Sequence, residues 1–431
     1  MHSYRRDLAM LRDRNFTLLL VARTISVLGA AFAPVALAFG VLALPGATAR
    51  TLSVVLTAEA LPMVVFMLVG GVIADRLPRH RVMMTAESLN ALAFLALAAM
   101  MLIGWTPLIA LAVAAAFSGV STAILFPALT GIVPDVVEAD RLQTANALLG
   151  LGTNISRVAG LVMGGMTVVL IGAGWALVVS GLMFALAAVL VTALRLRPVP
   201  PTAEAVRPAR TSLVDGVRSV FADLRGGWRE FVSRQWLWVV VAQFSLLVLA
   251  MQAAHGVLGP LVAKEQMGGA AAWSAVLAGE AIGMLAGILV TLRLRPSRPI
   301  LVATLMTLPS ALPYLLLGIS APLWTVVLGA VVMGVCFDVF GVLWNTTMQR
   351  EVPPEALSRV SSYDALGSLM FGPIGLMLAG PAAILVGARS ALLGCAALIL
   401  LASLAALLFP GVRGLRAPDP ATEAQAPVEA V

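Results

Sequence analysis

The sequence predicts an all-α membrane protein with twelve transmembrane helices, arranged as two six-helix halves in a parallel repeat. Three observations support this fold class: the composition, the number of apolar runs, and the placement of the basic residues. Hydrophobic residues make up 60% of the 431 residues and charged residues 11%, whereas soluble domains contain about 45–50% and about 25%. We therefore expect the lipid bilayer to surround most of this chain.

The apolar runs give the expected elements. A spanning helix needs about 20 mainly apolar residues, and twelve such runs are present. They cover residues 15–42, 51–75, 82–104, 107–133, 141–171, 174–194, 236–262, 271–292, 299–319, 322–349, 357–387 and 389–409. Several runs exceed the minimum length, so we expect tilted helices or helices that project beyond the bilayer.

The basic residues act as topology signals. Most of them lie before the first run, in the turn at 76–81, in the central loop at 195–234 and in the turn at 293–298. These segments fall on one side only if the helix count is even, and by the positive-inside rule that side is the cytoplasm. We expect a multi-pass protein of the plasma membrane with both termini cytoplasmic. The net charge of +7 does not indicate a nucleic-acid partner, because the basic residues punctuate apolar runs.

The chain also repeats itself. Residues 141–148 and 359–366 share an arginine, an apolar residue, an Asn or Asp and Ala-Leu at equal spacing, about half the chain apart. We therefore divide the chain into a first half at 1–194, a linker at 195–235, a second half at 236–409 and a disordered tail at 410–431. An amphipathic helix is expected in the linker, either lying on the inner membrane surface or packed under the helices.

A short basic turn joins the second and third runs, within the stretch 70–82. It contains Gly71, Asp75, Arg76, Arg79 and Arg81. This stretch resembles the signature loop of the major facilitator superfamily of secondary transporters, roughly Gly-x-x-x-Asp-Arg-x-Gly-Arg-Arg. Proline stands at 78 where the family usually has glycine. The Ala-Asp-Arg-Leu-Pro-Arg version is similar to that of twelve-helix exporters of siderophores and drugs.

The resemblance implies a gating role for this loop. Asp75 would face the positive N-terminus of the eleventh helix, near Ser361, with the loop arginines as partners, and would hold the inner side closed. Asp75→Asn should then favour the inward-open state. For Arg79 and Arg81 a role as topology anchors alone remains an alternative.

A second family feature lies in the fifth run. Gly160, Gly164 and Gly165 resemble the Gly-Pro-x-x-Gly-Gly core of the antiporter motif, which in that family marks exporters. Leu161 stands where the family has proline. The alternative interpretation is close packing of helices through small residues.

Charges inside the predicted spans indicate where transport chemistry lies, because charge in a bilayer is costly. They are Arg23, Glu59, Arg157, Glu280 and Asp338. At 1.5 Å per residue, Asp338 and Glu280 lie about 18 Å and about 20 Å from the nearest cytoplasmic arginine. Partial desolvation favours the neutral carboxyl and allows it to load and release a proton. Our coupling candidates are Asp338, Glu280 and Glu59, in that order, and static ion pairs with Arg157 or Arg23 are the alternative.

The resemblance implies that helices 3, 6, 9 and 12 face lipid and that the others line a central cavity. Candidate substrate contacts on the lining helices are Phe32, Phe126, Gln243, Gln252, His255, Trp344 and Asn345. An aromatic wall suits amphipathic molecules better than sugars. For each residue singly, packing between helices is the alternative, and His255 is expected to be a hydrogen-bonded pore residue rather than a proton relay.

The resemblance and the intramembrane acids together predict a secondary transporter that exports a small drug, siderophore or secondary metabolite in exchange for protons, by alternating access. A uniporter or importer of a small metabolite is the alternative. An intramembrane enzyme is a weaker one, because the nearest acidic cluster, Asp135, Glu138 and Asp140, occupies what we expect to be an ordinary loop. We expect no cofactor or metal, and a monomer, since one chain contains both halves.

Overall fold

The computed structural model describes residues 10–137, 141–194 and 228–416. Within these ranges the side chains of residues 68–76, 130–131, 134, 143, 354–355, 358–359 and 362 fall outside the description. The described chain is helical without strands, and twelve of its helical segments are long and apolar enough to cross a membrane. The predicted all-α class and the twelve spans are confirmed.

Six spanning helices come from the first part of the chain. They are α2 (Arg14–Leu42), α3 (Ala49–Arg76), α4 (Arg79–Ile103), α5 (Leu108–Gly131), α7 (Leu142–Ile171) and α8 (Ala173–Thr192). The short helices η1 (Met10–Arg12) and α6 (Val133–Val136) lie at their ends. α2 packs on α7 and α8, α4 on α5 and α8, and α3 on α5. We call these helices the first group.

The second group supplies the other six spans. Its helices are α10 (Gln235–Ala253), η3 (Ala254–Leu258), α11 (Gly259–Gln266), α12 (Ala270–Thr291), α13 (Pro299–Met306), η4 (Leu308–Ala311), α14 (Leu312–Gly318), α15 (Leu323–Glu351), α16 (Pro354–Val386), α17 (Ala388–Ala406) and α18 (Pro410–Gly414). α12 packs on α15, and α10 packs on α16 and α17. The groups touch each other chiefly through α3 on α16 and α7 on α12.

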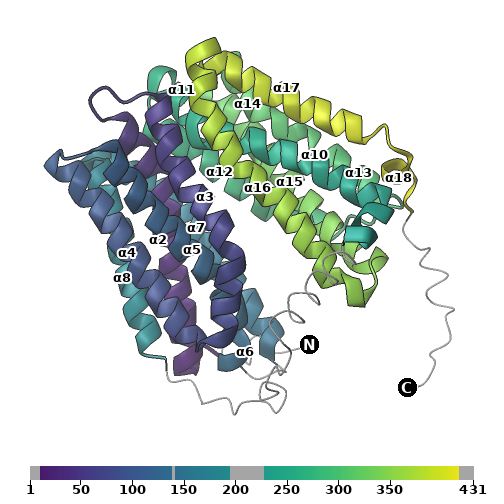
Figure 1. Ribbon diagram of the computed structural model, residues 1–431, viewed down its shortest axis with the longest axis horizontal. Helices are drawn as coiled ribbons and strands as arrows, with labels where there is room; N and C mark the ends of the chain where they lie inside the picture. Colours follow the sequence, from purple (N-terminus) through teal and green to yellow (C-terminus); the bar gives the residue numbers. More distant parts are fainter. Residues whose placement is uncertain (1–9, 138–140, 195–227, 417–431) are drawn as a thin grey trace, which may run out of the picture.

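The two groups meet at one end only. The largest apolar core contains residues of both groups, among them Leu37, Val55, Leu258, Val276 and Leu376. At the opposite end, each group has a separate core. Figure 1 shows the groups meeting beside α11 and diverging toward the ends that carry α6 and α18. We call these the joined end and the separated end.

Two spans are interrupted where the chain departs from α-helical geometry. The seventh span runs through η3, a π-helical turn that contains His255. The ninth span breaks at η4, a 3₁₀ turn that contains Pro309 and is followed by Pro313 in α14. π-turns within α-helices are frequent at functional sites, so His255 is a candidate functional residue.

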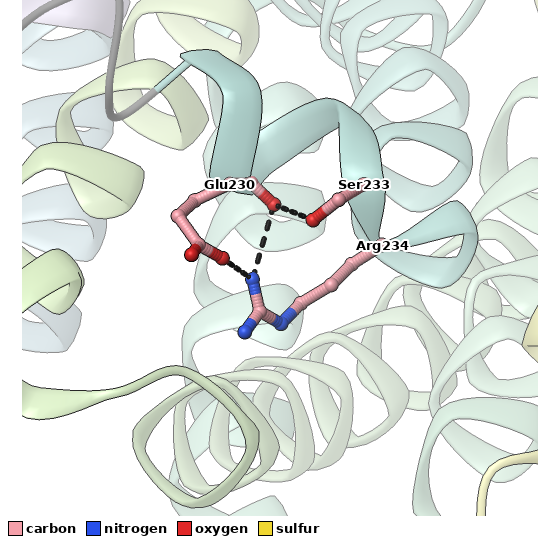
Figure 2. Close-up of polar contacts among 3 residues, drawn as sticks. All are labelled: Glu230, Ser233 and Arg234. Carbon is pink, nitrogen blue, oxygen red and sulfur yellow. Dashed lines mark hydrogen bonds and ion pairs between the residues drawn. The ribbon is translucent and has the colours of Figure 1, made fainter.

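The linker prediction falls mostly on residues 195–227, which lie outside the described residues. At its end, Phe231 is buried and packs with Trp228 against Tyr363 of α16. The carbonyl oxygen of Glu230 accepts hydrogen bonds from Ser233 Oγ (2.8 Å) and Arg234 Nη1 (3.1 Å), and the Glu230 carboxylate pairs with Arg234 (Figure 2). These contacts fix the corner from which α10 begins. The expected tail from Pro410 begins with α18, and residues 417–431 lie outside the description.

Candidate functional site

A cavity of about 490 Å³ lies between the two groups. Five predicted residues contribute to its wall: Glu59 and Arg157 from the first group, and Gln252, His255 and Glu280 from the second. The remaining wall is mainly apolar. The structure therefore brings together residues that are far apart in sequence, and it places carboxyl groups on both sides of one cavity.

The polar centre of this cavity is a His–Glu pair. His255 Nε2 lies 3.1 Å from Glu280 Oε2, and His255 Nδ1 lies 3.3 Å from the hydroxyl oxygen of Tyr314. Tyr314 is fully buried, and its hydroxyl also contacts the sulfur of Met333. The two partners of His255 hold its ring in one orientation, with Nε2 directed to the carboxylate. His255 is thus a direct partner of a coupling candidate, which the sequence did not predict.

Local packing explains how His255 reaches the cavity. It lies in the π-turn η3, and Gly256 follows it. A Cβ at Gly256 would lie 2.4 Å from Leu376 Cδ2 and 3.2 Å from Leu56 Cδ1, so this glycine allows η3 to approach both α16 and α3. The ring of Trp273 lies on the other side, with its centroid 6.0 Å from that of His255. The imidazole therefore packs beside apolar groups of η3, α3, α16 and α12, and its remaining surface faces the cavity.

Glu59 faces the same cavity from α3. Ser118 of α5 donates a hydrogen bond to Glu59 Oε1 at 3.3 Å. The neighbouring Gly119 allows the two helices to touch, because a Cβ there would lie 1.9 Å from the Glu59 carbonyl oxygen. Glu59 is thus held on a tightly packed helix pair, as a positioned acid requires.

Arg157 lines the cavity with an exposed side chain and makes no ion pair within the described residues. Glu280 pairs with His255 instead. Arg23 is half-buried on α2 and lies outside the wall of the cavity. The static arginine–carboxylate pairs considered as an alternative are therefore not formed by the described residues in this conformation.

Asp338, the first-ranked coupling candidate, does not contribute to the wall of this cavity. It packs over Gly287 of α12 and lies 3.5 Å from the Thr291 hydroxyl. Depth along α15 was estimated from sequence, but the direction in which α15 presents Asp338 depends on its packing against α12. The geometry therefore places Glu280 and Glu59, rather than Asp338, at the cavity.

Two of the expected substrate contacts are instead packing residues. Phe32 is buried where Gly164 approaches it. Gln243 Nε2 donates to Thr307 (2.9 Å) and Ser403 (3.1 Å), a buried network that joins three segments of the second group. These side chains pack against neighbouring helices or form hydrogen bonds with them. The expectation that they line the cavity is therefore wrong.

The other expected contacts also lie elsewhere. Trp344 is buried and donates its Nε1–H to Asp364 Oδ2 of α16 at 3.1 Å. Asn345 is exposed and donates to the carbonyl of Gly341 on its own helix, at 2.8 Å. Phe126 is 59% exposed and lies outside the cavity wall. Of the seven expected contacts, Gln252 and His255 line the cavity.

The third and sixth spans were expected to face lipid. Phe94 of α4 and Phe184 of α8 instead reach the cavity wall, with ring centroids 5.4 Å apart and stacked. Glu87 of α4 is also buried, with 1% of its surface exposed. Phe94 and Phe184 were not predicted at the cavity because each helix was expected to face a single environment, either lipid or the cavity.

Polar contacts cross between the groups at the joined end. The Ser53 hydroxyl of α3 donates to the Leu376 carbonyl of α16 and accepts from the Gly380 N–H at 3.4 Å. It also lies 3.4 Å from the Met377 carbonyl, which has no intrahelical donor because residue 381 is proline. In addition, Lys264 donates to the Leu42 carbonyl at the C-terminus of α2, where a cation is favourable.

The glycine motif of the fifth span also serves close contacts. A Cβ at Gly160 would lie 2.6 Å from Ala31 Cβ of α2, within the first group. At Gly165 it would lie 1.8 Å from Ser274 Oγ of α12, in the second group. The motif therefore packs α7 against its own group and, at the joined end, against the other group.

The gating motif is only partly described. Gly71, Asp75 and Arg76 lie where side chains fall outside the described residues, so their gating role stays a prediction. Arg79 Nη1 pairs with Asp135 Oδ1 of α6 at 3.3 Å. Arg81 is exposed. Asp135, expected in an ordinary loop, thus ties the start of α4 to α6, which follows α5.

Comparison with known proteins identifies the family. Residues 15–368 match the sequence model of the Major Facilitator Superfamily. The chain belongs to this superfamily of transporters. Among curated relatives, enterobactin exporter EntS of Shigella boydii serotype 18 is 28% identical over 341 residues, covering 74% of this chain and 75% of the relative. EntS of Escherichia coli O157:H7 gives the same identity and coverage.

Solved structures agree with this major facilitator fold. The nucleoside transporter NupG gives a TM-score of 0.69 at 13% identity, covering 91% of this chain and 98% of that one. A bacterial homologue of the human lysosomal transporter Spinster, solved in an inward-facing and unoccupied conformation, gives 0.65 at 14% identity, covering 93% and 98%. At this identity the likeness concerns the fold alone.

Proposed function

We propose that this superfamily member exports small amphipathic compounds across the plasma membrane in exchange for protons, by alternating access. The observation that carries the proposal is the His255–Glu280 pair in a cavity bounded by both groups. The enterobactin exporters among its relatives support the outward direction.

The described conformation supports an inward-open state. The separated end carries the basic residues of the inner loops, including Arg79 and Arg293, so the positive-inside rule favours the cytoplasm for this end. Both termini would then be cytoplasmic. At that end the cores of the two groups are independent. At the joined end Ser53, Lys264 and Gly165 mediate contact between the groups, which would close the outer side.

A coupling cycle follows from these positions. In the inward-open state Glu280 gives its proton to the cytoplasm, and the ionised carboxylate is stabilised by His255 Nε2. Substrate then enters the cavity from the cytoplasm. After the groups re-orient, Glu280 takes a proton on Oε2 from outside, its pairing with His255 weakens, and the substrate leaves. Glu59, on the opposite wall, is a second carboxyl for the same exchange.

The cavity wall favours an amphipathic substrate. The stacked rings of Phe94 and Phe184, together with Met63 and Met284, provide adaptable apolar surface. Arg157 and Gln252 supply polar groups that can orient a substrate. A drug, siderophore or secondary metabolite with an aromatic or aliphatic body and a few polar groups fits this description.

The proposal is tested in proteoliposomes that hold the purified protein with its cytoplasmic face outward. An acid-inside pH gradient is imposed, and a dye reports its collapse as lipophilic compounds are added. Collapse that depends on a particular compound and is lost in Glu280→Gln supports proton antiport. If no compound collapses the gradient, and one compound is taken up without a gradient, the result would contradict proton antiport and favour a uniporter.

A further inference from the structure

A second buried acid lies in the first group, away from the cavity. Glu87 of α4 is 1% exposed, and Asn90, one turn further along the same face, is 2% exposed. The Glu87 carboxyl lies beside the hydroxyl of Ser26 on α2, which is itself buried. None of these three residues contributes to the cavity wall. They form a polar cluster, Ser26–Glu87–Asn90, inside a helix bundle.

Two acceptor atoms of this cluster have no hydrogen-bond donor. Among the described residues, Glu87 Oε2 and Asn90 Oδ1 are buried without a partner. Side chains at positions i and i+3 of a helix lie about 5–6 Å apart at Cβ, so Glu87 and Asn90 are neighbours on one face of α4. A buried acceptor without a donor is destabilising, and an ionised carboxylate without a partner is far more so.

Among the described residues, the surroundings of the cluster supply no compensating charge. The turns of α4 before and after the cluster are apolar: Met83 and Ala86 belong to one core, and Ala91 and Phe94 to another. α5 and α8, which pack on α4, contain no charged residue.

The remaining neighbours of α4 are α2 and α3. On α3 the charge at membrane depth is Glu59, which faces the cavity. On α2 it is Arg23, one turn before Ser26, and no ion pair joins Arg23 to Glu87 within the described residues.

We propose that the Ser26–Glu87–Asn90 cluster is a proton-binding site, separate from the coupling cavity, and that Glu87 Oε2 holds one proton in this conformation. The proton converts Oε2 into a donor that can be directed to Asn90 Oδ1, while Ser26 faces the other part of the carboxyl. One proton thereby satisfies both orphaned atoms and removes the buried charge. The chemistry needs no co-reactant, since the proton comes from water when the bundle folds.

A proton fits the cluster better than a metal ion. Hard cations such as Ca²⁺ take about six to eight oxygen ligands, and this cluster supplies the oxygens of three side chains. No group of three His, Cys, Asp or Glu residues able to hold a metal occurs in the described part of the chain. Na⁺ is the competing occupant, and the experiment separates it from the proton.

Infrared spectroscopy of the full-length protein tests the site directly. The spectrum of wild type minus Glu87→Gln, at about pH 7, should contain the carbonyl band of one protonated carboxylic acid. Glu59→Gln, which removes an acid that faces the cavity, is the matched control for the spectral effect of replacing one glutamate within a span. A difference spectrum that contains only carboxylate bands would show that Glu87 is ionised and would overturn the proposal.

Thermal unfolding in detergent gives a second, independent readout. Because the folded state favours the neutral acid, the unfolding midpoint of the wild type should fall by about 2–4 °C relative to Glu87→Gln between about pH 5 and about pH 9. The fall should be the same in sodium and in N-methylglucamine buffers. Parallel pH profiles of the two proteins would overturn the proposal, and stabilisation of the wild type by sodium alone would assign the site to Na⁺ instead.

A measurement of proton-driven transport tests whether Glu87 is distinct from the coupling residues. Glu87→Gln keeps the shape and the neutrality of the protonated acid, so the variant should retain transport. If it folds but loses transport, the proton at Glu87 is exchanged during the cycle and the separation from the cavity is wrong.

Discussion

His255 Nε2 lies 3.1 Å from Glu280 Oε2, in a cavity whose opposite wall carries Glu59 and Arg157. The pair comes from neighbouring spans of the second group, and the other two residues come from the first. A change in the relation between the groups therefore changes the surroundings of both carboxyl groups. The proposed coupling by alternating access requires this arrangement.

Replacing His255 should weaken proton-driven transport. His255→Ala removes the 3.1 Å contact of Nε2 with Glu280 Oε2, so the Glu280 carboxyl loses the partner that positions it at the cavity. Accumulation driven by a pH gradient in proteoliposomes should therefore fall by about tenfold, the size expected for loss of a hydrogen bond to a charged group. Tyr314→Phe, which removes only the 3.3 Å contact to Nδ1, should give a smaller loss. Accumulation by His255→Ala equal to that of the wild type would contradict a role of His255 in coupling.

A side chain at Gly165 should weaken closure of the joined end. A Cβ there would lie 1.8 Å from Ser274 Oγ, so Gly165→Ala forces α7 away from α12. Spin labels at Thr48→Cys and Val386→Cys, with Cys336 and Cys395 replaced by serine, report the distance between α3 and α16 at that end. We expect longer distances in Gly165→Ala. Gly150→Ala, on the same helix with nothing within 4 Å of its Cβ, should leave the distances unchanged.

Ser53 should bias the conformational equilibrium. Its hydroxyl bonds to α16 beside Pro381, and Ser53→Ala leaves those backbone groups without this partner in the joined state. The loss of about 1 kcal/mol corresponds to about a fivefold shift toward opening of that end, measured with the same spin-label pair. Ser180→Ala removes a 2.9 Å bond to the Gly29 carbonyl within the first group and should lower stability without shifting the equilibrium. Equal shifts in both variants would contradict a latch at Ser53.

Gln243 should affect stability rather than substrate recognition. Gln243→Ala removes the donor shared by Thr307 and Ser403 and leaves a cavity, at a cost of about 1–3 kcal/mol. Thermal unfolding should show this loss, while the apparent substrate affinity of the folded fraction stays unchanged. Gln252→Ala, at the cavity wall, should instead weaken the apparent substrate affinity and leave the thermal stability unchanged. A changed substrate affinity in Gln243→Ala would show that Gln243 contributes to substrate binding and would contradict this prediction.

The fold could be predicted from the sequence for two reasons. The thickness of the bilayer sets the length of each apolar run, and the placement of the arginines requires an even number of spanning helices. Helix ends fell close to the expected ones: the run expected at 174–194 is α8, Ala173–Thr192. The direction of each side chain around its helix was less accessible. Asp338 and Gln243 lie on lining helices at suitable depths, but their packing turns them toward neighbouring helices.

The site could be predicted only in part for the same reason. Glu59, Arg157 and Glu280 were found because a charge at membrane depth is conspicuous in a sequence. The contact of His255 with Glu280 depends on the π-turn η3, and no pattern in the sequence predicts this turn. Glu87 was passed over because it lies near the start of its span, and its burial follows from the position of Ser26 on another helix.

Glu280→Gln tests the central claim most directly. With a compound found in the dye assay, proteoliposomes are used to compare exchange of labelled for unlabelled compound at equal pH with accumulation driven by an imposed pH gradient. We predict that Glu280→Gln retains exchange, because the neutral side chain resembles the protonated acid, and loses accumulation, because no proton is released. Gradient-driven accumulation equal to that of the wild type would contradict proton coupling through the His255–Glu280 pair.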